Sequence, residues 1–476
     1  MTLYNPLKMG KTVTYMLQNV EYQPRAYIAW LRRTRSFGKV MYRRQLEPTK
    51  AAKLFTLFVT AGMTLQLLAA VLVEFVAISR GSVVLAVVAV ALIATTPAIW
   101  ALAVCIPLVA GRILVSGPKE KRLIEASKTI FKNHKATKIA VAGSYGKTSM
   151  KELLGVVLGE GKNVAITPSN KNVASSHAIF ARKLTGDEDV LVVEFGEGAP
   201  GDVARYTATL HPDIGVITGI APAHLDHYAS LDEAAHDIFS LGDYLHTKPL
   251  YVNGESHPAG PYIKTGQLVY TAQGVGDLKV TNFALSLEGM TFELHGPRTK
   301  YKLQTSLIGQ HLVGPLTAAV SIAENIGLTK DQIEAGVAKT TPFEHRMQPR
   351  RLASGAWIID DTYNGTIEGI RAGLALLKDL PARRKIYVTP GLVDQGAEAS
   401  KIHNELGSLI AAAQPQLVVL MQNSAAADIQ QGMQKASFAG ELHVEADPLA
   451  FYTNIEHFVA GGDLVMMQND WPDNYK

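Results

Sequence analysis

The sequence predicts an α/β protein in which a central domain with a phosphate-binding loop (P-loop) is followed by a smaller α/β domain and preceded by two transmembrane helices. Three observations predict this arrangement. Two long apolar stretches lie before residue 110, a glycine-containing loop stands between a strand and a helix near residue 145, and apolar runs then alternate with helical patterns. A chain of 476 residues exceeds what one core usually organises, so several folded units are expected.

The composition excludes several classes of protein. A formal net charge of +4 is too small for this length to indicate a nucleic-acid-binding protein. The single cysteine, Cys105, excludes an internal disulfide framework and a cysteine-rich zinc site.

The two apolar stretches are residues 54–78, where Glu74 is the only charge, and residues 83–109, which carry no charge. As helices rising about 1.5 Å per residue, each can cross a hydrocarbon core of roughly 30 Å. The four-residue connector 79–82 predicts a hairpin. A signal peptide is disfavoured because a long polar segment precedes the first stretch, and a pair of buried helices in a soluble core is disfavoured because neither stretch has a polar face.

Basic residues flank both ends of this hairpin, which predicts that both termini and the domains after the hairpin are cytoplasmic and that the chain is a multi-pass protein of the cell (inner) membrane. The segment 27–42 alternates aromatic residues with arginines, so it lies along the anionic inner leaflet or is a solvated basic tail. The flanking residues are Arg32, Arg33, Arg35, Lys39, Arg43, Arg44 and Lys50 before the hairpin, and Arg112, Lys119, Lys121 and Arg122 after it.

The apolar run 138–143 has strand character, and the helical pattern begins just after residue 149. A loop between a strand and a helix can cradle phosphates with its backbone N–H groups and the helix N-terminus. Lys147 is expected to reach the outer phosphates and Thr148 to hold Mg²⁺. The generic pattern has a further glycine where Val141 stands, so an ordinary turn is the alternative. The expected nucleotide-binding residues are Gly143, Ser144, Tyr145, Gly146, Lys147, Thr148 and Ser149.

From residue 138 to the C-terminus the chain resembles the Mur ligases, and within them the MurF-type enzymes, which add a dipeptide. Six segments resemble family motifs in the same order. They are the loop 143–149, the segment 167–173 with Asn170 and Asn172, the strand 190–202 with Glu194, the segment 211–230 with His224, the segment 308–311, and the paired motifs at 343–346 and 358–365.

The resemblance implies an ATP-dependent ligase of peptidoglycan precursor synthesis, which activates a carboxylate as an acyl phosphate and joins it to an amino acid or dipeptide. It implies ATP and Mg²⁺ as cofactors. Lys147, Glu194 and His224 are implied as catalytic residues, and Thr148 joins Glu194 and His224 as a metal ligand. Asn170 and Asn172 are implied to contact the substrate.

The second domain is implied to contribute four more residues to the nucleotide or the incoming amine. They are Arg346, Asp361, Tyr363 and Asn364.

Three features depart from the family pattern. Counted from His224, Ile238 occupies the position of the lysine that is carbamoylated in MurF-type enzymes and helps to hold a second metal ion. Leu312 and Pro315 occupy the positions of two asparagines associated with adenine recognition. Only about thirty residues separate the apolar hairpin from the loop, too few for the family's UDP-binding domain.

The predicted organisation is a basic cytoplasmic segment 1–50, a transmembrane hairpin 51–115, a central ATP-binding domain 116–342 with late hairpins at 260–302, and a C-terminal domain 343–476. Two alternatives to the leading function stay open. One is a Mur-like ligase or amidotransferase subunit acting on a lipid-linked precursor, and the other is a catalytically inactive, membrane-anchored nucleotide-binding scaffold.

Overall fold

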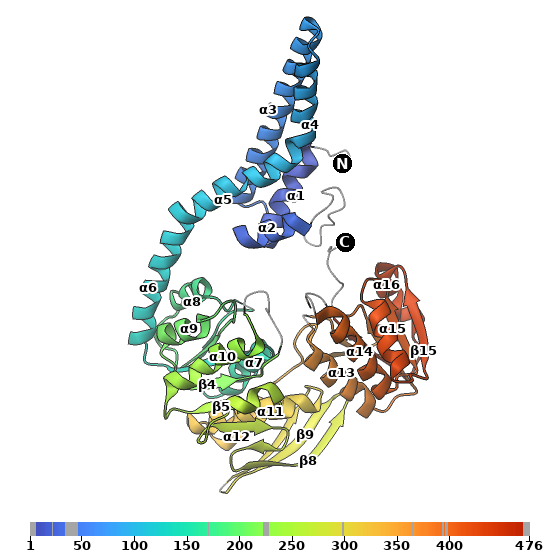
Figure 1. Ribbon diagram of the computed structural model, residues 1–476. Coiled ribbons are helices and arrows are strands. Elements are labelled where there is room, and N and C mark those ends of the chain that lie inside the picture. Colours follow the sequence, from blue (N-terminus) through green and yellow to red (C-terminus); the bar gives the residue numbers. More distant parts are fainter. Residues whose placement is uncertain are drawn as a thin grey trace. The chain divides into compact units, whose positions relative to one another are not determined.

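The computed structural model describes residues 6–20, 22–33, 46–169, 171–221, 228–297, 299–363, 365–392, 395 and 398–469 (Figure 1). The chain divides into two compact units, residues 1–122 with 473–476, and residues 123–472. Three predicted site residues, Asn170, His224 and Asn364, lie outside the described residues.

The first unit is helical. Its helices are α1 (Pro6–Asn19), α2 (Pro24–Arg33), α3 (Lys50–Arg80), α4 (Val83–Ala103), α5 (Cys105–Gly111), a π-helical turn η2 (Arg112–Ser116) and the start of α6 (Gly117–Asn133). Helix α3 begins at Thr49, whose side chain accepts a hydrogen bond from the Ala52 N–H, and ends at Gly81 in the left-handed conformation, as helix caps require. The two stretches Lys50–Arg80 and Val83–Asn133 are long and apolar enough to cross a membrane. The helix that contains the predicted apolar stretch 83–109 continues beyond it, through η2 into α6.

Helices α3 and α4 form the predicted hairpin, and they lie side by side (Figure 1). A polar contact inside this apolar pair fixes its register. The Gln66 side-chain amide donates to the Leu92 carbonyl at 2.9 Å, and its oxygen accepts the Trp100 indole N–H at 2.8 Å.

The described part of the predicted basic segment is folded, because α1 and α2 pack on the hairpin. Val13, Leu17 and Tyr27 are fully buried in one apolar cluster with Val59 of α3 and further residues of α4 and α5. The Tyr27 hydroxyl donates to the Ala101 carbonyl at 2.9 Å. Residues 27–33 are therefore not a solvated tail, and residues 34–45 lie outside the described residues.

The second unit opens with a ten-stranded sheet in the order β10-β9-β8-β7-β6-β5-β4-β1-β3-β2. Strands β1 to β6 are parallel, and β7 to β10 continue the sheet as antiparallel hairpins, which confirms the hairpins predicted at 260–302. The strands are β1 (Thr137–Ala142), β2 (Val164–Ile166), β3 (Val190–Glu194), β4 (Ile214–Ile217), β5 (Leu250–Asn253), β6 (Leu268–Thr271), β7 (Gly274–Val275), β8 (Leu278–Ser286), β9 (Gly289–His295) and β10 (Lys300–Thr305).

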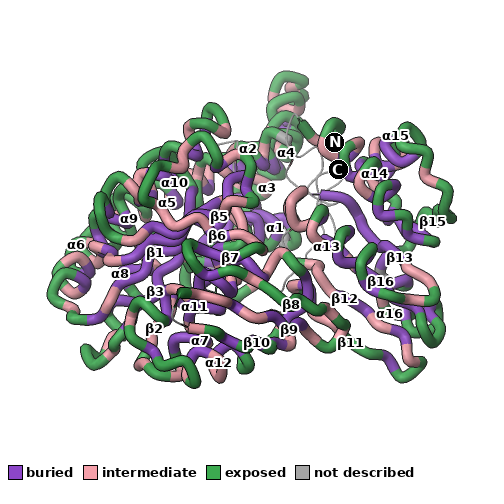
Figure 2. Tube along the Cα trace, turned by 90° about the horizontal axis from the view of Figure 1, so that it is seen from below, coloured by how far each residue is buried: buried purple, intermediate pink, exposed green. Residues whose placement is uncertain are grey.

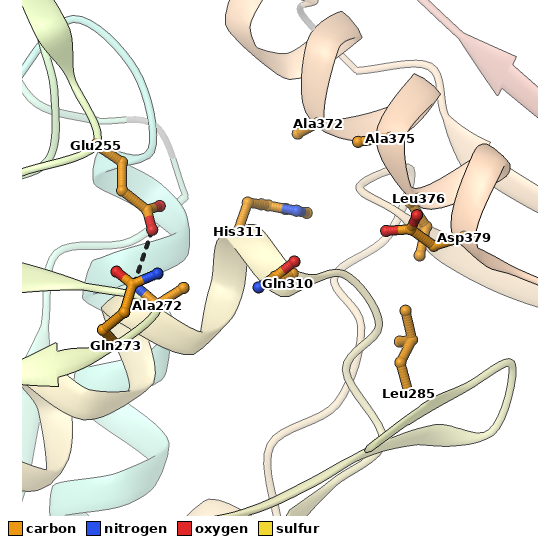
Figure 3. A pocket seen from close by; sticks show the side chains of 10 residues that line it. All are labelled: Glu255, Ala272, Gln273, Leu285, Gln310, His311, Ala372, Ala375, Leu376 and Asp379. Atoms are coloured by element: carbon orange, nitrogen blue, oxygen red, sulfur yellow. Dashed lines mark hydrogen bonds between the residues drawn. The ribbon is translucent and has the colours of Figure 1, made fainter. Parts of the chain in front are cut away.

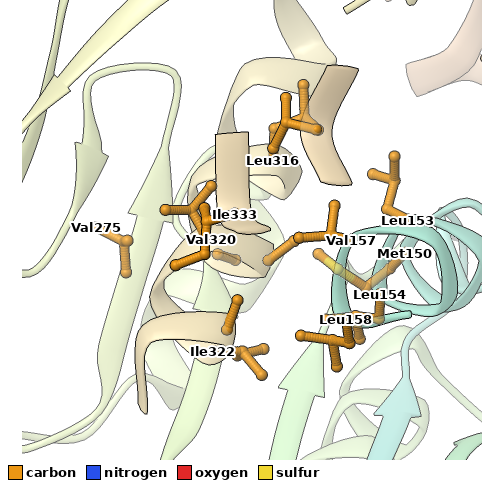
Figure 4. Close-up of a cluster of buried hydrophobic side chains, with 14 of the residues drawn as sticks. Met150, Leu153, Leu154, Val157, Leu158, Val275, Leu316, Val320, Ile322 and Ile333 are labelled. Atoms are coloured by element: carbon orange, nitrogen blue, oxygen red, sulfur yellow. The ribbon is translucent and has the colours of Figure 1, made fainter. Parts of the chain in front are cut away.

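Helices cover both faces of this sheet, so its central strands β1, β3 and β4 are buried along nearly all of their length (Figure 2). Helix α7 packs with α11 and α12 through Leu154, Val157, Val320 and Ile333 (Figure 4). The helices of this part are α7 (Lys147–Leu158), α8 (Ala174–Ala181), α9 (Asp202–Leu210), α10 (Leu231–Leu245), α11 (Val313–Asn325) and α12 (Lys330–Ala338), with short 3₁₀ turns η3 (His257–Tyr262) and η4 (Gln310–Leu312).

The C-terminal part is a second α/β fold, built on a six-stranded sheet in the order β11-β12-β16-β13-β14-β15. All of its strands are parallel except β11. Its elements are β11 (Gln348–Arg351), β12 (Trp357–Asp361), α13 (Ile367–Asp379), β13 (Arg384–Thr389), α14 (Ala399–Ala413), β14 (Leu417–Met421), α15 (Ala426–Lys435), β15 (Glu441–Glu445), α16 (Pro448–Phe458) and β16 (Asp463–Gln468).

Candidate functional site

The predicted phosphate-binding loop joins β1 to α7 at the carboxyl edge of the parallel strands, where α/β sheets place their ligands. Gly143 has φ 141°, and a Cβ there would lie 2.4 Å from the Thr218 hydroxyl and 2.9 Å from the Gly219 carbonyl. No residue with a side chain fits. The end of β4 supports the loop from outside, since the Ser144 N–H donates to the Gly219 carbonyl at 2.8 Å and the Thr218 hydroxyl donates to the Ala142 and Tyr145 carbonyls.

Lys147 is the first residue of α7, and its ammonium group is buried in the loop. The Nζ atom lies 2.7 Å from Glu197 Oε2, and it also donates to the carbonyls of Gly143 and Ser144. The side chains of Lys147 and Glu197 are 10% and 3% exposed. The cation expected to meet phosphate therefore has a carboxylate partner from its own chain.

Glu194, the last residue of β3, lies beside the next residue of the loop. Its Oε1 atom accepts from the Thr148 hydroxyl at 3.1 Å and from the Asn172 amide at 3.3 Å. Its Oε2 atom is 3.5 Å from the Nζ of Lys151, a fully buried lysine one turn along α7, and makes no hydrogen bond within the described residues. The structure thus brings together Thr148, Asn172 and Glu194, as the motifs predict.

This donor set suits a magnesium ion. Mg²⁺ is usually held by one or two carboxylates together with phosphate oxygens and water, which are hard oxygen ligands. A threonine hydroxyl beside the half-satisfied carboxylate of Glu194 provides such ligands. Among the described residues no cluster of three or more His, Cys, Asp or Glu could hold a metal ion by itself, so the phosphates would complete the coordination.

A buried histidine fixes the backbone that carries Glu194. His177 of α8 contacts the Glu194 carbonyl through Nε2 at 2.8 Å, and its ring packs against Phe195 and Tyr206. Burial lowers the pKa of His177 to about 4, so the ring is neutral at physiological pH. It holds the carboxylate in place without adding a charge.

Three of the residues predicted in the C-terminal part also lie together. The Arg346 guanidinium lies 4.8 Å from the centre of the Tyr363 ring, a cation–π contact. Asp361, at the end of β12, accepts from the Gln468 amide at 2.7 Å and from the Met347 N–H at 3.2 Å. Burial raises the pKa of Asp361 to about 6, although these hydrogen bonds and the charge of Arg346 oppose the shift.

Comparison with known proteins decides the family. The Mur ligase middle domain matches residues 141–323, and the Mur ligase glutamate ligase domain matches residues 345–468. The chain belongs to the Mur ligase family.

Curated relatives that match the chain carry the name of the MurF-type enzyme. The UDP-N-acetylmuramoyl-tripeptide–D-alanyl-D-alanine ligase of Escherichia coli K12 is 26% identical over 332 residues, which are 64% of this chain and 71% of the relative. The enzyme of that name from Mycobacterium leprae is 27% identical over 364 residues, 70% of each chain.

Solved structures share the fold. MurF from Acinetobacter baumannii aligns with a TM-score of 0.65 and 21% identity, over 74% of this chain and 77% of that one. MurF from Thermotoga maritima in complex with ADP aligns with a TM-score of 0.63 and 21% identity, over 74% and 80%. This chain is therefore a MurF-like, ATP-dependent ligase.

The structure explains what replaces the carbamoylated lysine in this Mur ligase. Ile238 of α10 is fully buried in the apolar core, so no polar group stands at that position. Its neighbour Asp237 has both oxygens engaged, since Oδ1 accepts from the Gly201 N–H at 3.1 Å and Oδ2 from the Tyr228 hydroxyl at 2.8 Å. Asp237 therefore supports the loop before α9 and the residue Tyr228.

A cavity of about 290 Å³ lies between η4 and α13 (Figure 3). His311 of η4 points into it opposite Ala372 and Ala375 of α13. Burial raises the pKa of the loop residue Tyr145, and the carboxylates of Glu368 and of Glu255, which lines the cavity, raise it to a smaller extent. The lining residues are Glu255, Ala272, Gln273, Leu285, Gln310, His311, Ala372, Ala375, Leu376 and Asp379.

Sequence reasoning missed three residues of the site, namely Lys151, His177 and Glu197. The four-residue spacing of Lys147 and Lys151 places both on one face of α7, and this signal could have identified Lys151. The other two carry no spacing signal, because their partners are set by the packing of separate elements.

Proposed function

We propose that this Mur ligase joins a dipeptide of the D-alanyl-D-alanine type to the carboxylate of a UDP-N-acetylmuramoyl-tripeptide, with cleavage of ATP to ADP and phosphate. The observation that carries the proposal is the phosphate loop with Lys147 at the start of α7, where Thr148 donates to Glu194 and Lys151 lies 3.5 Å from the same carboxylate. The names of the relatives supply the substrate class.

The chemistry follows in two steps. An oxygen of the carboxylate attacks the γ-phosphorus of ATP and ADP leaves. The amine nitrogen then attacks the acyl carbon, loses a proton and expels phosphate. Phosphoryl transfer depends on positioning and on neutralising charge around the γ-phosphate. Lys147 and the loop N–H groups supply that charge, and Mg²⁺ bound near Thr148 and Glu194, with His224 as a further ligand, would neutralise the phosphate oxygens.

The remaining parts take roles consistent with this reaction. The cavity would receive the nucleobase, because apolar side chains and polar groups alternate in its lining. Arg346, Tyr363, Asp361 and Asn364 would meet the nucleotide or the incoming amine, and Asn170 and Asn172 the acceptor.

The two apolar helical stretches would anchor the enzyme in the cell membrane with its catalytic part in the cytoplasm. A reporter fused after Lys476 should label only when cells are permeabilised. Labelling of intact cells would contradict this topology.

The deciding experiment incubates the full chain, in mild detergent, with ATP, the dipeptide and the acceptor in UDP-linked or lipid-linked form. We expect ADP release that depends on both substrates, and a product of the summed mass less water. The Lys147→Ala variant is the control for contaminating ligase. If only the lipid-linked acceptor is turned over, the proposed UDP-linked substrate is wrong. If nucleotide binds but neither acceptor is turned over, the protein is an inactive scaffold.

A further inference from the structure

The phosphate-binding lysine already has its full set of acceptors. A lysine ammonium group carries three protons. Lys147 directs them to Glu197 Oε2 at 2.7 Å and to the carbonyls of Gly143 and Ser144. A phosphate that binds to Lys147 must therefore displace one of these three partners.

Glu197 is the partner that can leave. The two carbonyls belong to the loop itself, which is fixed by the end of β4. Glu197 comes from the irregular segment after β3 and is neither in a strand nor in a helix. Its second oxygen, Oε1, is buried without a hydrogen-bond partner among the described residues, so Lys147 is the contact that compensates its charge.

We propose that Glu197 is an internal competitor for nucleotide phosphate, which occupies Lys147 in the empty site and releases it when nucleotide binds. The inference rests on the proposed nucleotide site and adds a residue that sets its affinity. The carboxylate takes the place of a phosphate oxygen on the ammonium group, an exchange of one charge-assisted contact for another.

The exchange makes binding depend on a divalent cation. When Lys147 turns to phosphate, Glu197 becomes a buried carboxylate without a cation, which is strongly unfavourable. A nucleotide that arrives with Mg²⁺ brings positive charge to this side of the loop, whereas a metal-free nucleotide adds only negative charge. Wild-type protein should therefore discriminate strongly against metal-free nucleotide.

The test measures the Kd of ADP by calorimetry for the full chain in detergent, once with excess Mg²⁺ and once with EDTA. Glu197→Gln keeps the shape of the side chain and removes its charge. We expect this variant to bind metal-free ADP at least tenfold more tightly than wild type does. Its Kd values with Mg²⁺ and with EDTA should therefore differ less than those of wild type. Glu197→Ala should act in the same direction. Glu160→Gln is the matched control, since Glu160 also pairs with a lysine, Lys339, but past the far end of α7.

Two results would overturn the proposal. Unchanged ADP binding in Glu197→Gln under both conditions would show that Glu197 does not compete for Lys147. If Glu197→Gln bound ADP more weakly than wild type in the presence of Mg²⁺ and equally well in EDTA, Glu197 would be a cation ligand instead. If wild type bound no ADP under either condition, the nucleotide site itself would be wrong, which separates that failure from failure of this inference. Thermal unfolding confirms that each variant is folded.

Discussion

Replacing Lys147 by alanine should lower both activity and stability, because the residue has two partners at different times. In the empty site it neutralises Glu197, whose side chain is only 3% exposed. Removing one member of a buried ion pair leaves an uncompensated charge and typically costs about 3–5 kcal/mol. In the reaction it neutralises the transferring phosphoryl group, and losing such a group raises the barrier by about 3–4 kcal/mol, a loss of at least a hundredfold in ATP turnover.

The double variant Lys147→Ala/Glu197→Gln separates the two roles. It removes the uncompensated carboxylate charge of Glu197, so we expect it to be about 2–3 kcal/mol more stable than Lys147→Ala. Its ATP turnover should be as low as that of Lys147→Ala. Hydrogen exchange of strands β1 and β3, measured on the full chain in detergent, reports the free energy of opening around the pair. Equal exchange in the single and double variants would refute the view that Glu197 depends on Lys147 for its burial.

Three further predictions concern other parts of the chain. The pKa of His177 is about 4 in the folded protein and about 6.5 in the unfolded chain, so the free energy of unfolding falls as the pH drops from 6.5 to 4. His177→Gln should lose about 2 kcal/mol less stability than wild type between pH 7.5 and pH 5, measured by urea unfolding at both pH values. Glu194→Gln should leave the fold intact, reduce turnover at least a hundredfold at low Mg²⁺ and raise the Mg²⁺ concentration that half-maximal turnover needs, and an unchanged Mg²⁺ dependence would contradict a role as metal ligand. Gln66→Leu breaks the contact with Trp100 and should destabilise the α3–α4 hairpin by about 1 kcal/mol, measured by unfolding in mixed detergent micelles.

The sequence predicted those features that depend on short stretches of chain. The loop and Glu194 follow apolar runs of strand character, and parallel strands bring their carboxyl ends to one edge, so the meeting of Thr148 with Glu194 could be expected. The apolar hairpin is similarly evident, since it is a continuous property of composition. Both predictions use only local pattern and the geometry of a parallel sheet.

Features that arise from distant packing could not be predicted. Glu197 lies 50 residues from Lys147, and no motif marks it. The packing of α1 and α2 could not be predicted, because Val13 and Leu17 are buried by contacts with helices that lie far away in the sequence. The length of the helix that contains the second apolar stretch was not evident either, since hydropathy falls after residue 109 but helical structure continues through η2.

The support of the loop by Thr218 has a consequence for the newly made chain on the ribosome. Thr218 lies 73 residues after Tyr145 in sequence, and β4 reaches β1 only as a long-range parallel neighbour. Such pairs form slowly, because a long loop must close before any contact stabilises it. A nascent chain that has exposed β1, α7 and β3 thus holds the loop without its support. Nucleotide can first stabilise the growing protein after β4 has left the exit tunnel, which sets the earliest point at which ATP could assist its folding.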